Sequence, residues 1–151
     1  MAILEVNNVK KIYTARFGSN RVQALSDVSF SVEEGEYVAV MGESGSGKTT
    51  LLNIIAALDK PTDGEVCLNG RRFSDIKEAE IAKFRREHLG FVFQEFNLLD
   101  NFSIKDNILL PLVLAGRQYH EMDKRLTPVA RKLGISEILS KYPYEVSGGQ
   151  K

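Results

Sequence analysis

The chain has 151 residues, 20 basic and 20 acidic side chains, and a hydrophobic fraction of 43%. These values predict a soluble protein of one domain, or of one domain with a subdomain. A net charge of zero indicates no broad basic face, so we expect no nucleic-acid partner. The single cysteine, Cys67, is typical of a reducing cytosol. We see no signal peptide, and the longest apolar run, residues 108–115, is shorter than the roughly 20 residues of a membrane span.

The N-terminal residues predict two strands. Ile3–Tyr13 and Val22–Val32 are separated by a long polar loop. In the second segment, five apolar or small residues share one parity, which is typical of a half-buried antiparallel strand. They are Val22, Ala24, Val28, Phe30 and Val32. A turn follows at Glu33–Glu36.

An apolar run, a glycine-rich loop and a helix then follow one another. Glu36–Met41 has the composition of a buried parallel strand. Residues 42–49 read GESGSGKT and fill every fixed position of the G-x-x-x-x-G-K-[ST] phosphate-binding pattern. Thr49–Leu58 has helical spacing, with four apolar residues on one face. These are Leu51, Ile54, Ile55 and Leu58.

This order predicts a nucleoside triphosphate site. Glycines let the backbone take left-handed angles, so successive N–H groups can point at one anion. The helix N-terminus adds its dipole, Lys48 adds a positive charge, and the Thr49 hydroxyl can ligate Mg²⁺. The expected nucleotide-binding residues of the loop are Gly42, Glu43, Ser44, Gly45, Ser46, Gly47, Lys48, Thr49 and Thr50. The alternative is a glycine-rich turn that contains a lysine by chance.

Between the P-loop helix and the C-terminal helices, we expect short strands, turns and one helix. We expect Pro61–Gly64 to stop the helix, Glu65–Leu68 to form a strand, and Asn69-Gly70 to form a hairpin turn. Glu78–Glu87 predicts a charged helix, with Arg85, Arg86 and Glu87 on a solvated face. His88–Phe93 predicts an apolar strand that ends at Gln94.

Two helices are predicted near the C-terminus. Ser103 and Asp106 form a capping-box pattern at the start of Ile104–Ala115. A second helix covers Tyr119–Leu133 and closes at Gly134. The predicted fold class is therefore α/β: a P-loop core with an N-terminal antiparallel β-subdomain and a helical subdomain.

Beyond these helices, residues 141–150 read KYPYEVSGGQ, and SGGQ on its own could be a polar turn. After a P-loop and a helical segment, VSGGQ resembles the signature of ATP-binding-cassette transport ATPases, although that signature usually begins with Leu where Val146 stands. Gln94 resembles the family's Q-loop glutamine, and Tyr13 its adenine-stacking aromatic residue. The sequences GESGSGKTT and FRREHLGFVFQEFNLLDNFSIKDNILLPL resemble those of the family branch whose ATPases drive FtsX-like permeases. Within that branch it is similar to bacitracin-export-type ATPases and shares much with macrolide-export and lipoprotein-release ATPases.

The resemblance implies a head-to-tail pair of copies with two ATP molecules between them. One copy supplies the loop amides, Lys48 and Thr49 to each ATP. The other copy supplies its signature residues, which are Ser147, Gly148, Gly149 and Gln150. Lys48 and Gln94 are the implied catalytic residues, Thr49 and Gln94 the implied Mg²⁺ ligands, and Tyr13 stacks on adenine, with Phe17 as a weaker candidate. The implied location is the inner face of the cell membrane, held there by the permease.

Plainer interpretations stay open for several of these residues. Tyr13 could pack against the sheet, and Gln94 could be an ordinary strand end. Four apolar residues after Gln94 could form core, or an apolar groove for a permease helix. They are Leu98, Leu99, Phe102 and Ile104. His88 and His120 have no partner at ligand spacing, so we expect no zinc site.

The resemblance also implies more chain than is printed. The family continues with a strand ending in Asp-Glu, a dimer-contact loop and a switch histidine, none of which lies in residues 1–151. We therefore expect a truncated cassette that lacks the C-terminal part of its sheet, with residues 1–93 as β-subdomain and P-loop core and 94–151 as Q-loop and helical subdomain. The missing strand would lie beside Tyr37–Met41, so we expect that strand to lose ladder partners and to gain an exposed apolar edge. A longer parent would be the ATPase, and this part would bind nucleotide weakly without turnover. Alternatives are a nucleotide sensor without turnover, a non-transport cassette ATPase and a P-loop kinase.

Overall fold

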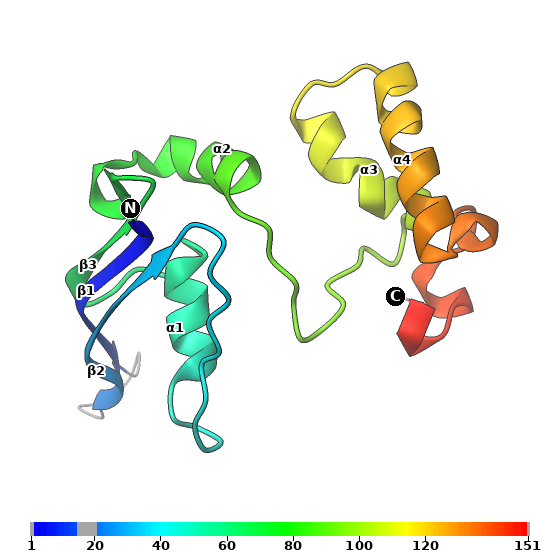
Figure 1. The fold of residues 1–151 in the computed structure, drawn as a ribbon. Coiled ribbons are helices and arrows are strands. Elements are labelled where there is room, and N and C mark those ends of the chain that lie inside the picture. Colours follow the sequence, from blue (N-terminus) through cyan, green and yellow to red (C-terminus); the bar gives the residue numbers. More distant parts are fainter. Residues whose placement is uncertain (1, 15–20, 151) are drawn as a thin grey trace. The chain divides into compact units, whose positions relative to one another are not determined.

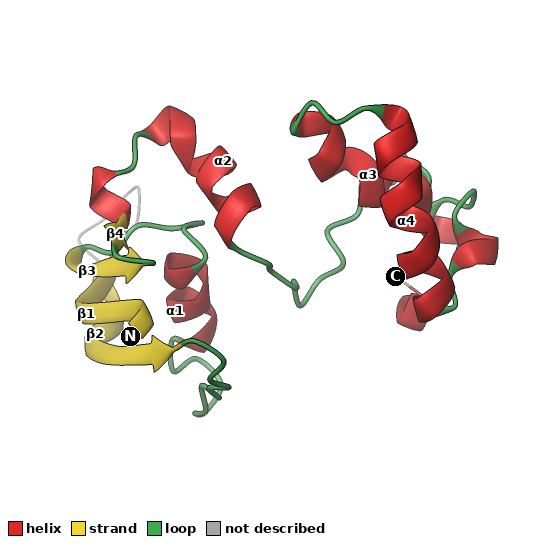
Figure 2. Ribbon diagram, turned by 45° about the horizontal axis from the view of Figure 1, so that its top comes forward, coloured by secondary structure: helices red, strands yellow, loops and turns green. Residues whose placement is uncertain are grey.

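A computed structural model describes residues 2–14 and 21–150, which divide into two compact units (Figure 1). The first unit runs up to Phe91 and the second begins at Val92. The first contains all the strands, and the second is helical (Figure 2).

The first unit is built on a four-stranded antiparallel sheet in the order β2-β1-β3-β4. The strands are β1 (Ala2–Thr14), β2 (Arg21–Glu33), β3 (Asp63–Leu68) and β4 (Arg71–Arg72). The two predicted N-terminal strands and the strand after Pro61–Gly64 are therefore confirmed. The predicted Asn69-Gly70 turn joins β3 to β4 with φ values of 51° and 74°, as a tight hairpin turn requires.

The long strands β1 and β2 are bent by a paired irregularity. Asn8 and Asp27 take left-handed angles, with φ of 49° and 58°. The Asn8 side-chain amide donates to the Asp27 carboxylate at 2.9 Å, which compensates this strained backbone on both strands. The predicted single parity of β2 is broken here: Leu25 is buried from the other parity, and Val22 is exposed.

Helix α1 (Lys48–Ile55) packs on the sheet (Figures 1 and 2). Its Leu51 and Ile54 are buried with residues of three strands. Those residues are Val6, Val9, Leu25 and Val66. The helix ends earlier than predicted, because Ala57 takes a left-handed φ of 54° and reverses the chain before Pro61. Leu58 consequently leaves the predicted apolar face and is 43% exposed.

Two predicted strands are wrong. Glu36–Met41 and residues 89–93 lie outside the sheet and outside every helix. Tyr37, Met41 and Val92 are 94%, 88% and 96% exposed. A strand exists only where a neighbour completes its ladder of hydrogen bonds. Among the described residues, no strand pairs with either segment, so apolar composition alone did not produce the predicted buried strands.

Helix α2 (Glu78–His88) is the last helix of the first unit and is one residue longer than predicted. Its Phe84 is buried with Leu68 and Ile76, next to the 3₁₀ turn η1 (Phe73–Asp75). Arg85 departs from the predicted solvated face, because its guanidinium donates to the Ala57 carbonyl at 2.8 Å. That contact holds the reversed end of α1.

The second unit contains the two predicted C-terminal helices, α3 (Ile104–Leu114) and α4 (Tyr119–Leu133). The capping box is confirmed: Ser103 Oγ accepts from the Asp106 amide, and the Asp106 carboxylate accepts from the Ser103 amide. Gly134 ends α4 with a left-handed φ of 70°. Short 3₁₀ turns follow at Ser136–Ile138, Pro143–Glu145 and Gly148–Gln150.

Two apolar clusters hold this unit together. One joins α3 to α4 through Leu109, Met122, Leu126 and Ala130. The other brings Ile104, Ile138 and Val146 together, so the residue before Ser147 is anchored in the interior. Within the described part of the chain, no helix has the length and apolar character needed to cross a membrane.

Candidate nucleotide-binding site

The loop between Met41 and α1 has the backbone that its glycines predict. Gly45 and Gly47 have φ of 82° and 92°, a region that L side chains rarely adopt. Gly47 has a second constraint: a Cβ atom there would lie 2.4 Å from the Ala24 carbonyl oxygen on β2. The loop is therefore pressed against the sheet at the point where α1 begins.

Lys48 is folded onto this loop. Its ammonium group donates to the Gly42 and Glu43 carbonyl oxygens at 2.9 and 2.6 Å, and it lies 3.4 Å from Ser46 Oγ. These bonds place a positive charge beside the loop amides, and among the described residues no ion pair joins Lys48 to a carboxylate. The first turn of α1 also contains no acidic residue, so the positive end of the helix dipole is left for an anion.

The two predicted ligands that follow differ in exposure. The Thr49 side chain is exposed and Thr50 is half-buried. In the described part of the chain, no group of three or more His, Cys, Asp or Glu side chains could hold a metal ion. The hydroxyl oxygen of Thr49 is a hard oxygen ligand of the kind that Mg²⁺ accepts alongside phosphate oxygens.

Tyr13 lies near the end of β1 and is 42% exposed. Its hydroxyl donates to Asp59 Oδ2 at 2.9 Å. The Lys11 ammonium lies 4.9 Å from the ring centroid, where it can interact with one face of the ring. The ring is therefore held at its polar tip and only half covered. Phe17, the weaker candidate, lies outside the described residues.

The other predicted site residues belong to the second unit. Gln94 is exposed in an irregular loop. The four residues Ser147, Gly148, Gly149 and Gln150 are all exposed as well. The Ser147 amide and hydroxyl both lie 3.1 Å from Gln150 Oε1, so the segment is closed by its own glutamine. Val146 anchors it in the interior.

Of the four apolar residues after Gln94, two are packed as core residues and two are partly exposed, as residues of an apolar groove would be. Ile104 is buried and Leu98 packs against it, as core residues do. Leu99 and Phe102 are 47% and 38% exposed. The Asn107 side chain holds this loop in place, since it accepts from the Leu99 amide and donates to the Leu99, Phe102 and Ser103 carbonyls.

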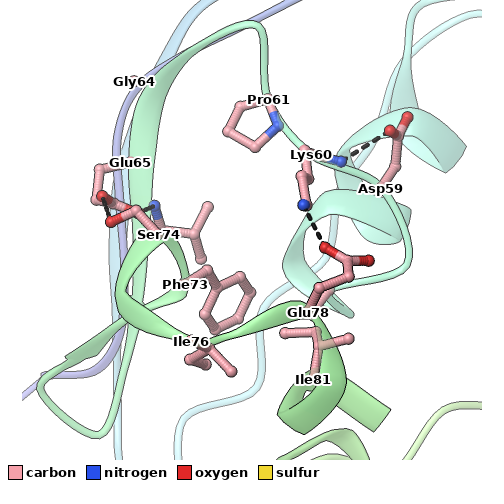
Figure 3. Close-up of a pocket in the computed structure, with 12 residues that line it drawn as sticks. Asp59, Lys60, Pro61, Gly64, Glu65, Phe73, Ser74, Ile76, Glu78 and Ile81 are labelled. Carbon is pink, nitrogen blue, oxygen red and sulfur yellow. Dashed lines mark hydrogen bonds and ion pairs between the residues drawn. The ribbon is translucent and has the colours of Figure 1, made fainter.

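A cavity of about 330 Å³ lies elsewhere in the first unit (Figure 3). Phe73, Ile76, Ile81 and Pro61 line its apolar part. Two polar pairs lie among its lining residues, Lys60 with Glu78 and Ser74 with Glu65, each at 2.5 Å. No predicted site residue lines this cavity.

Comparison with known proteins places these features in a family. A family model described as "ABC transporter" matches residues 25–151. The chain belongs to the ABC transporter family. The resemblance inferred from GESGSGKTT and VSGGQ is thereby confirmed.

Its curated relatives include an exporter subunit. The bacitracin export ATP-binding protein BceA of Halalkalibacterium halodurans is 48% identical over 151 residues, which is all of this chain and 59% of the relative. The uncharacterized ABC transporter ATP-binding protein YvcR of Bacillus subtilis is 51% identical, again over all of this chain and 58% of the relative. The chain thus spans less than two thirds of the length of these relatives.

A solved ABC structure confirms the fold class. The ATP-binding cassette MJ0796, as a dimer in a post-hydrolysis state with ADP and Pi, has a TM-score of 0.88 and 38% sequence identity. The match covers 97% of this chain and 64% of that chain.

The motifs did not indicate some residues that support the site. Asp59 and Lys11 carry no role in the P-loop or signature patterns, yet both contact Tyr13. Asn107 lies between motifs and was expected only to be part of a helix. Hydrogen bonds between distant segments leave no fixed spacing in a sequence, so pattern reasoning had no signal for them.

Proposed function

We propose that this chain is the ATP-binding part of an ABC ATPase that drives an exporter. The loop between Met41 and α1 carries the proposal. It combines left-handed glycines at 45 and 47, the Lys48 ammonium folded onto the loop carbonyls, and an α1 N-terminus with no acidic residue in its first turn. This arrangement suits the β- and γ-phosphates of a nucleoside triphosphate.

The site residues are assigned as follows. The amides of residues 42–50 and Lys48 hold the phosphates, Thr49 ligates Mg²⁺, and Tyr13 stacks on adenine. Gln94 acts on Mg²⁺ or on the attacking water and senses the permease. Mg²⁺ held by Thr49 would supply positive charge to neutralise the phosphates.

A second copy completes each site through Ser147, Gly148, Gly149 and Gln150. This assignment is supported by the exposure of all four residues and by the dimeric form of the structural relative MJ0796. Bare glycine amides and a hydroxyl are suitable donors to a γ-phosphate.

The partner we propose is an FtsX-like membrane permease, and the cargo a peptide antibiotic or similar amphiphile. The protein would work on the inner face of the cell membrane through that permease. Support comes from the relatives: one is named for bacitracin export, and another, at 38% identity, is the macrolide export ATP-binding/permease protein MacB of Hyphomonas neptunium.

Nucleotide binding gives the direct test. We expect a fluorescent ATP analogue with Mg²⁺ to bind the purified chain, and Lys48→Ala to weaken binding at least about tenfold, the loss of one charge-assisted contact. Lys132→Ala, an exposed lysine at the end of α4, is the matched control. Equal affinity of the Lys48→Ala and Lys132→Ala proteins would refute the assignment.

The cellular role is tested by complementation. In cells that lack a bacitracin export ATPase and hold its permease, a hybrid carrying residues 1–151 in place of the matching part should restore resistance. The same hybrid with Lys48→Ala should not. Restoration by both versions would contradict an energising role.

A further inference from the structure

Tyr13 is attached to the end of the P-loop helix by one carboxylate. Asp59 Oδ2 accepts the Tyr13 hydroxyl at 2.9 Å, and Asp59 Oδ1 accepts the Lys11 ammonium at 2.6 Å. Lys11 also donates to the Lys60 carbonyl at 2.6 Å, and the Lys60 amide donates to Asp59 Oδ1 at 2.7 Å. Both oxygens of Asp59 are thus used to hold β1 against the loop after α1.

The position of this carboxylate is fixed by α1 itself. The Asp59 amide donates to the Asn53 carbonyl at 3.2 Å, and the Leu58 amide donates to the same oxygen at 2.8 Å. Arg85 holds the neighbouring Ala57 carbonyl from α2. The loop that carries Asp59 therefore moves with the helix whose first residue is Lys48.

The cluster is charged and partly shielded from solvent. The side chains of Lys11 and Asp59 are 12% and 30% exposed. Burial raises the pKa of Asp59, but hydrogen bonds from Lys11, Tyr13 and the Lys60 amide outweigh it and hold the pKa below its ordinary value. Asp59 is consequently ionised at neutral pH, and its charge-assisted bonds are of the stronger kind.

From this geometry we propose that Asp59 is a positioning residue for the nucleobase. Asp59 fixes the position of the Tyr13 ring relative to helix α1. The residues that contact the base and the residues that contact the phosphates are therefore held in a fixed arrangement. Lys11 lies over one face of the ring, and in this proposal the base stacks on the opposite face. The inference rests on the proposed ATP site. It adds the residues that fix the distance between Tyr13, which contacts the base, and the loop that contacts the phosphates.

The prediction separates the base from the phosphates. The readout is the ratio of the affinity for ATP to the affinity for inorganic tripolyphosphate, each measured with Mg²⁺. Asp59→Ala should lower the ratio roughly three- to tenfold, because a displaced ring loses part of the stacking that aromatic side chains give a base. Tripolyphosphate affinity should stay unchanged, since a displaced Tyr13 affects only the base.

Two further variants make the test specific. Tyr13→Phe keeps the ring but removes the hydroxyl that Asp59 holds, so it should lower the ratio to a similar extent even if Asp59→Ala does not fold. Asp63→Ala is the matched control: this acid is the first residue of β3 and pairs with Lys10 of β1 at 3.8 Å on the exposed surface. It should leave the ratio unchanged.

Each outcome is decisive. A lowered ratio in Asp59→Ala and Tyr13→Phe, with no additional loss in the double variant, supports the inference. An unchanged ratio in Tyr13→Phe, or an equal loss of ATP and tripolyphosphate affinity in Asp59→Ala, overturns it and leaves the ATP site intact. If the unsubstituted protein binds neither ligand, the proposed function fails and the inference fails with it.

Discussion

Replacing Gly47 by alanine should destabilise the protein before any nucleotide is added. At a φ of 92° a residue with a Cβ atom costs roughly 1–2 kcal/mol. The new Cβ would also lie 2.4 Å from the Ala24 carbonyl oxygen and 2.9 Å from Leu25 Cδ2. Relieving such overlap typically costs about 1–3 kcal/mol more, so we expect a total loss of about 2–5 kcal/mol.

Gly45 offers a matched comparison within the same loop. Its φ of 82° is similar, but a Cβ there would meet no described atom within 4 Å. Gly45→Ala should therefore cost only the conformational term of roughly 1–2 kcal/mol. The difference between the two variants isolates the contact between the loop and β2.

Urea unfolding of the nucleotide-free protein, followed by circular dichroism, measures both losses. Gly47→Ala should shift the midpoint clearly further than Gly45→Ala, with similar slopes. Equal shifts in the two variants would mean that the close approach to Ala24 does not hold in solution, and the account of the loop would be wrong.

Two other predictions concern residues that support the site. Asn107→Ala should destabilise the protein by about 1–2 kcal/mol in urea unfolding, because the half-buried Asn107 side chain loses its hydrogen bonds to the loop before α3. Asn101→Ala, an exposed amide in that loop, should be nearly neutral, and a similar cost in both variants would show that the Asn107 hydrogen bonds do not stabilise the loop. Asp59 has a pKa below its ordinary value of 3.8, so its stabilising contribution is present above that pH and is lost as the pH falls through the lowered pKa. The stability gap between the parent and Asp59→Asn should thus narrow below about pH 4; a gap that stays constant from pH 7 to pH 3 would show that the carboxylate charge is irrelevant.

Short sequence patterns correctly predicted the turns and helix ends that depend on interactions between residues close together in the chain. The Asn69-Gly70 turn, the Ser103–Asp106 capping box and the Gly134 helix end were all predicted from their residue types, because each depends on neighbours a few positions away. The family was likewise readable from GESGSGKTT and VSGGQ.

The failures share a different cause. Glu36–Met41 was predicted as a buried strand, but pairing is decided by a distant segment that a window of sequence does not contain. The support of Tyr13 by Asp59 joins residues 46 positions apart and was missed for the same reason. The roles of Gln94 and Ser147 stay predictions.

The extended segment from Tyr37 to Met41 has a practical consequence for anyone who handles this chain. Its apolar side chains are largely solvent-facing, and its backbone lies outside the sheet. Another copy of the chain can pair with an exposed apolar segment of this kind through intermolecular β-strand hydrogen bonds. We therefore expect a preparation of this chain to stay monodisperse longer at low concentration than at high concentration, even at constant temperature.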